Sequence, residues 1–73
     1  MQKRKLTSPR EDVVRLLQEV RKAEGMPQEH LAELVGTKKY KISQMESGRY
    51  NPSLDFLVMV ADGLGKEISV KVM

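Results

Sequence analysis

The sequence contains no cysteine and no long apolar run, and each absence excludes a class of protein. Without cysteine the chain has no disulfide and no cysteine-ligated metal site, which fits a reducing compartment. No apolar stretch approaches the roughly 18 residues that a membrane span requires. The basic start, Met1 to Leu6, lacks the apolar region of a secretion signal. We therefore expect a soluble, cytoplasmic protein with no membrane partner.

The chain also lacks the residue sets on which catalysis and metal binding depend. His30 is its single histidine and has no histidine partner for a metal, so we interpret it as a surface residue. No nucleophile, base and orienting group can be assembled, and no glycine loop could hold a phosphate. The sequence thus predicts no metal, no cofactor and no enzymatic activity.

Positive charge is concentrated in two islands of the 73-residue chain, whose net charge is +3. Residues 1–10 carry four bases and no acid, and residues 37–49 carry four bases against Glu46. The intervening residues 11–36 have six acids against three bases. Two basic islands suit a polyanion such as DNA, although charge alone leaves an ordinary solvated surface equally open.

The first predicted helix begins at Ser8 and ends before Gly25, after a flexible basic arm over residues 1–7. A serine cap, Pro9 in the first turn and Glu11 three residues after Ser8 form a typical helix start. The arm could reach a minor groove or remain a disordered tail. The apolar positions of this helix form one stripe at helical spacing: Val13, Leu16, Leu17 and Val20.

Two short helices are predicted next, over residues 27–35 and 38–46, separated by Gly36 and with Thr37 as the cap of the second. The first has its core side chains at Leu31, Leu34 and Val35. The second has only Ile42 and Met45 as apolar anchors, so most of its surface is free for something other than the core.

A fourth helix is predicted over residues 53–62, with Ser53 as its cap. Its predicted core side chains are Leu54, Leu57, Met59, Val60 and Ala61. Residues 66–73 then alternate, with Ile68, Val70 and Val72 on one face, which predicts a strand. Because the chain offers no second strand, we expect this one to pair across a homodimer, with packing on its own helices as the alternative.

Residues 28–47 match the spacing of a helix-turn-helix. If Gln28 is counted as the first position, the fifth is Ala32. A small residue is needed at this position because the two helices cross closely there. Gly36 is ninth, where the chain reverses, and glycine accepts a left-handed conformation there without steric cost. Ile42 is fifteenth and fixes the second helix to the core. Together with a basic outer face, this spacing indicates a helix that enters the major groove.

The runs Gln28–Gly36, Ile42–Arg49 and Asn51–Leu54 resemble the Cro/phage-repressor, or XRE, family over about residues 10–65. The resemblance implies a mainly α, lambda-repressor-like domain of four to five helices over residues 8–65. It also implies a sequence-specific DNA-binding regulator, most simply a repressor. The residues that it places on DNA are Gln28, Thr37, Lys38, Lys39, Tyr40, Lys41, Ser43, Gln44, Ser47, Arg49 and Asn51.

The resemblance also implies distinct roles for these residues. Gln28 would bond a phosphate and brace the recognition helix, lysine and glutamine side chains there would read bases, and the later residues would contact the backbone. Arg21 and Glu46 match a family pair that forms a partly buried salt bridge, which we interpret as structural. Pro27 stands where the family commonly has a capping side chain, so that cap is lost.

A helix-turn-helix followed by a short strand in so small a chain is similar to the arrangement in antitoxins of toxin–antitoxin modules. This resemblance implies a toxin as a second partner. A homodimer would place two recognition helices about 34 Å apart, on a palindromic operator. The alternative function is a protein-interaction module that binds a toxin or coactivator and reads little DNA.

Overall fold

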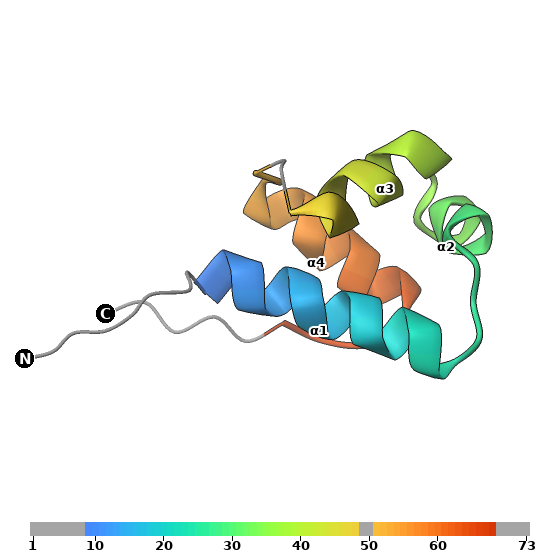
Figure 1. Ribbon diagram of the computed structural model, residues 1–73, viewed down its shortest axis with the longest axis horizontal. Coiled ribbons are helices and arrows are strands. Elements are labelled where there is room, and N and C mark those ends of the chain that lie inside the picture. Colours follow the sequence, from blue (N-terminus) through green and yellow to red (C-terminus); the bar gives the residue numbers. More distant parts are fainter. Residues whose placement is uncertain (1–8, 49–50, 69–73) are drawn as a thin grey trace, which may run out of the picture.

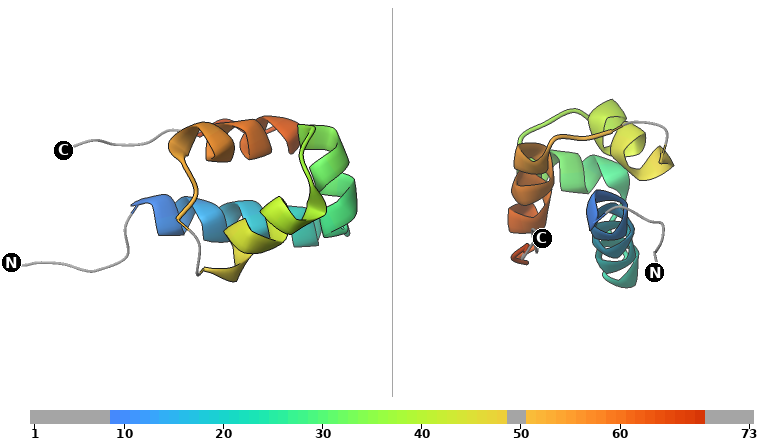
Figure 2. Two further views of the ribbon diagram at one scale, coloured as in Figure 1. Left: turned by 90° about the horizontal axis from the view of Figure 1, so that it is seen from above. Right: turned by 90° about the vertical axis from the view of Figure 1, so that its left-hand side faces the viewer.

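The computed structural model describes residues 9–48 and 51–68, and all regular secondary structure within these ranges is α-helical. The helices are α1 (Pro9–Ala23), α2 (Gln28–Val35), α3 (Lys39–Ser47) and α4 (Leu54–Gly63). α1 and α4 lie side by side, α2 lies across one end of this pair, and α3 lies at the upper edge of the domain in Figure 1 (Figures 1 and 2). The four predicted helices are confirmed; the arm over residues 1–7 and the cap at Ser8 lie outside the described ranges.

The reversal between α2 and α3 begins at Gly36, whose φ of 86° is left-handed as its position in the motif requires. The backbone N–H groups of Gly36 and Thr37 both donate to the carbonyl of Ala32, at 2.9 Å each. Thr37 therefore belongs to the closing turn of α2. The prediction that Thr37 caps α3 is wrong, because the N-cap residue is Lys38, which makes no side-chain capping bond.

The start of α4 follows its prediction closely. Ser53 is the N-cap residue, and its Oγ accepts a hydrogen bond from the backbone N–H of Phe56 at 3.1 Å. α2 starts without a side-chain cap at Pro27, as expected. The carbonyl of Pro27 still accepts from the N–H groups of His30 and Leu31, so the first turn of α2 is closed by the backbone alone.

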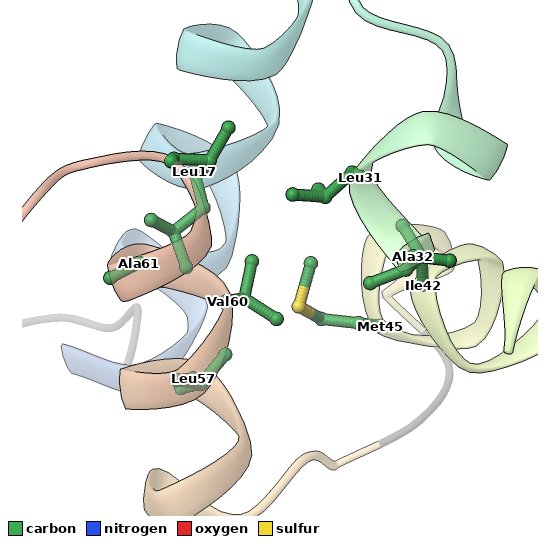
Figure 3. Packing of buried hydrophobic residues seen from close by; sticks show 9 residues of the cluster. Leu17, Leu31, Ala32, Ile42, Met45, Leu57, Val60 and Ala61 are labelled. Carbon is green, nitrogen blue, oxygen red and sulfur yellow. The ribbon is translucent and has the colours of Figure 1, made fainter. Parts of the chain in front are cut away.

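A single core joins all four helices, and its members are almost inaccessible to solvent. Figure 3 shows the Met45 side chain of α3 pointing toward Val60 of α4, with Leu31 of α2 and Leu17 of α1 in the same group of side chains. The buried apolar residues are Leu17, Leu31, Ala32, Ile42, Met45, Leu57, Val60, Ala61 and Leu64. The burial of Ala32 and Ile42 agrees with their places in the helix-turn-helix spacing.

Gly63 allows α4 to approach α2 closely. A Cβ atom at this position would lie 2.9 Å from Cγ2 of Val35, which is too close for an ordinary contact. The absence of a side chain at residue 63 thus permits the close approach of α4 to α2.

Four predicted core residues are instead exposed at the edges of their helices. Because successive residues of a helix point about 100° apart, an apolar residue beside a core position can face solvent. Leu17 turns inward and its neighbour Leu16 does not, whereas Leu54 is exposed as the first residue of α4, one turn before the buried Leu57. The exposed residues, with their exposed fractions, are Leu16 (59%), Leu34 (50%), Leu54 (47%) and Met59 (48%).

The predicted C-terminal strand is not observed in the part of the chain that the structure describes. Residues 66–68 have no regular secondary structure, and Ile68 is half-buried against the core cluster. Val70 and Val72, the other two residues predicted for the dimer contact, lie outside the described ranges. Within those ranges, no helix combines the length and the apolar character that crossing a membrane requires.

Candidate nucleic-acid interface

α3 has a narrow buried side and a wide exposed one. Ile42 and Met45 are fully buried, and the side chain of Glu46 is only 2% exposed. The other described positions of the helix are exposed except Lys41, which is half-buried. The core therefore holds α3 by one side and leaves the opposite side in solvent.

The centre of the exposed side is formed by uncharged side chains. At about 100° per residue, Tyr40 points nearly opposite to the mean direction of Ile42, Met45 and Glu46. Gln44, one turn later, continues the same row. Ser43 and Ser47 lie on one side of this row, and the Ser47 hydroxyl donates to the Gln44 carbonyl at 2.8 Å. We call Tyr40, Ser43, Gln44 and Ser47 the outer face of α3.

Lysines flank this outer face on both sides. Lys39 lies beyond one edge and Lys41 beyond the other, while Lys38 precedes the first turn. Among the described residues, none of these lysines forms an ion pair, and the first turn of α3 has no acidic residue. Because the first N–H groups of a helix also carry partial positive charge, the start of α3 is a strongly positive region.

The buried side of α3 ends in a polar cluster that we call the Glu46 junction: Gln18, Arg21, Gln28 and Glu46. Nε of Arg21 donates to Oε2 of Glu46 at 2.7 Å, and Nη2 donates to Oε1 at 2.9 Å, so the pair is bidentate. The amide nitrogens of Gln28 and Gln18 also donate to Oε1, at 2.9 and 3.3 Å. Arg21 uses its remaining nitrogen, Nη1, to bond the Met26 carbonyl at 2.6 Å.

The Glu46 carboxylate is charged in spite of its burial. Burial raises its pKa, but the hydrogen bonds from Arg21 and Gln28, the positive charge of Arg21 and the bond from Gln18 together leave the pKa below its ordinary value of 4.5. One ionised group thus binds side chains from α1 and α2 while belonging to α3. The junction therefore joins α3 to both α1 and α2.

The structure brings most of the sequence-predicted DNA-contacting residues to one region around α3. Gln28 is half-buried at the start of α2, and its amide is held by Glu46. Thr37 is half-buried in the turn, and Asn51 is exposed shortly after α3. Arg49 lies outside the described ranges.

Gln18 is the residue that the sequence interpretation missed. It precedes Arg21 by three residues and therefore lies on the same side of α1. That spacing was the available signal, but a glutamine on a helix surface is commonplace. Only the approach of α3 gives Gln18 an acceptor.

Comparisons with known proteins agree with this geometry. The family model described as helix-turn-helix matches residues 17–71. An uncharacterized HTH-type transcriptional regulator of Methanothermobacter thermautotrophicus is 46% identical over 52 residues, which cover 71% of this chain and 75% of the relative. A chain in the structure of the HipA-HipB-O2-O3 complex has a similar fold, with a TM-score of 0.75 and 24% identity, over 96% of this chain and 97% of that one.

Proposed function

We propose that this chain, which belongs to the helix-turn-helix family of transcriptional regulators, represses transcription as a homodimer on a palindromic operator. Family membership makes it a DNA-binding regulator, since the motif and the 46% identical relative cover most of the chain. The proposal goes beyond family membership in three respects: it names the residues that contact DNA, the oligomeric state, and repression as the direction of regulation.

The observation that carries the proposal is the outer face of α3. A helix whose exposed side is uncharged at its centre and basic at both edges matches a major groove, where base edges lie between two phosphate backbones. Ser43 and Gln44 would contact bases. Lys39 and Lys41, for which the family resemblance implies base reading, flank the outer face of α3, so we assign them to phosphates instead. Gln28, Thr37, Lys38, Ser47, Arg49 and Asn51 are proposed as backbone contacts.

Dimerisation is proposed through the C-terminal segment, residues 66–73. Ile68 already lies against the core cluster, and Val70 and Val72 continue its alternation. Pairing of this segment with its copy would satisfy its backbone groups and place two α3 helices about one turn of DNA apart. One copy alone covers half of such a site.

The test is DNA binding by the full chain at several salt concentrations, after selection of a preferred duplex from a random pool. We expect a palindromic consensus, and a log–log salt slope that falls by about 1 per copy in Lys39→Ala because one phosphate contact is lost. Arg15→Ala, on α1, is the matched control and should leave the slope unchanged. Selection that yields no consensus, or an unchanged slope in Lys39→Ala, would contradict the proposal.

A second function, binding of a partner protein, is favoured by exposed apolar side chains on α2 and α4. Leu34 of α2 and Leu54, Val58 and Met59 of α4 are each about half exposed (50%, 47%, 49% and 48%). The fold match to a chain of the HipA-HipB-O2-O3 complex suggests the partner class, so we propose an autoregulating antitoxin with a toxin partner. We expect the product of the adjacent reading frame to co-elute with both wild type and the Lys39→Ala, Gln44→Ala double variant.

A further inference from the structure

We propose that Tyr40 is a specificity-determining residue that contacts the 5-methyl group of one thymine in each half-site. This inference rests on the proposed function, because it assigns a base contact to the outer face of α3. It goes further by naming the chemical group that this face selects.

Tyr40 has the position required for such a contact. It lies in the first turn of α3, and the N-terminal residues of a recognition helix are those that approach base edges. Its direction is nearly opposite to the buried side of α3, so it stands at the centre of the outer face. The residue is 59% exposed, which leaves most of the ring free to touch a ligand.

The chemistry of the outer face singles out the thymine methyl. Tyr40 carries the only large apolar surface on the exposed part of α3, since Ser43, Gln44 and Ser47 are polar. In the major groove the four bases present hydrogen-bonding groups, and the thymine methyl is their one apolar group. An aromatic ring between two lysine-bearing edges would therefore gain most by burying that methyl.

The exposure of Tyr40 also separates this role from a structural one. The ring does not belong to the core cluster, so its removal should leave the free energy of unfolding within about 0.5 kcal/mol of wild type. A loss of base preference in Tyr40→Ala would then not be explained by partial unfolding.

The experiment uses the full chain and the duplex selected for it, with each thymine replaced in turn by deoxyuridine, which removes only the methyl group. For wild type, each half-site should contain one thymine whose single replacement lowers the affinity roughly fourfold, equivalent to about 0.8 kcal/mol for one buried methyl. Tyr40→Phe keeps the ring and should retain this sensitivity. Tyr40→Ala should bind more weakly and lose the sensitivity at that thymine only.

Each other outcome overturns the inference in a recognisable way. If Tyr40→Ala keeps the uracil sensitivity, another residue reads the methyl. If Tyr40→Phe binds more weakly while no replacement matters to wild type, the hydroxyl makes the contact, as it would to a phosphate. A selected half-site without thymine also overturns it. Failure to bind any duplex overturns the proposed function itself, whereas binding without methyl dependence overturns only the role of Tyr40.

Discussion

The two sides of α3 differ in almost every physical property. The inner side consists of Ile42 and Met45, which are fully buried, and of Glu46, whose carboxylate accepts four hydrogen bonds. The outer side consists of exposed polar side chains around Tyr40, with lysines at its edges. Nine residues thus contain both a fixed anchor and a free surface.

This difference shows how a small domain can anchor a recognition helix without using the surface of that helix that is proposed to contact DNA. Apolar burial fixes the distance of α3 from the core, but it is non-directional. The Glu46 junction adds direction, because a bidentate pair has a defined geometry. Changes on the inner side should therefore alter stability, and changes on the outer side should alter DNA affinity alone.

The largest effect is expected from Arg21→Ala, which leaves the buried Glu46 carboxylate without its charged partner. Loss of one member of a buried pair typically costs about 3–5 kcal/mol in the free energy of unfolding. Urea unfolding followed by circular dichroism measures it. The matched control is Arg15→Ala, because Arg15 pairs with Asp12 at 3.3 Å on the surface, where a pair contributes about 0.2–1 kcal/mol. Equal losses in the two variants would contradict a structural role for the junction.

A slightly smaller loss is expected from Ile42→Ala, which opens a cavity beneath α3. Removal of a fully buried isoleucine side chain to Cβ costs about 2–5 kcal/mol. Ser43→Ala is the neighbouring control on the outer side and should change the free energy of unfolding by less than about 0.5 kcal/mol. If Ser43→Ala were as destabilising as Ile42→Ala, the division between the two sides of α3 would be wrong.

The sequence predicted the inner side of α3 better than the edges of the other helices. The spacing of Ala32, Gly36 and Ile42 is a local pattern with a definite steric meaning, and all three residues behave as it requires. The cap at Ser53 is local in the same sense. Thr37 was assigned to the wrong helix, because the closing turn of α2 takes one residue more than the pattern reveals.

The features that could not be predicted from the sequence depend on how the helices pack against one another. Leu16 and Leu17 are adjacent leucines, and only the position of α4 and α3 around α1 decides which is buried. The bonds from Gln18 and Gln28 to Glu46 join residues 28 and 18 positions apart, so no local pattern contains them. The Arg21 and Glu46 pair was expected only through a family resemblance, and the structure contains it at 2.7 Å.

A moderate decrease in the free energy of unfolding is expected at acidic pH, because the pKa of Glu46 lies below its ordinary value of 4.5. A carboxylate with a lowered pKa stabilises the fold above its unfolded-state pKa, and this contribution is lost as the pH falls through the folded-state pKa. The difference in free energy of unfolding between wild type and Glu46→Gln should therefore be constant near neutral pH and shrink below about pH 4.5. A difference that does not change with pH would show that Glu46 is not held as an ion.

The smallest effects on stability are expected from substitutions of two glutamines. Gln28 bonds to Glu46 on the inner side of α3, and Gln44 lies on its outer side. Gln28→Ala removes one of the donors to the buried Glu46 and should cost about 1 kcal/mol in the free energy of unfolding. Gln44→Ala removes an exposed side chain and should cost less than about 0.5 kcal/mol. If Gln44 pairs with a base, the same change lowers the affinity for the selected duplex about tenfold or more. Because the two variants delete the same group, a Gln44→Ala variant that unfolds more easily while binding DNA normally would reverse the assignment of inner and outer sides.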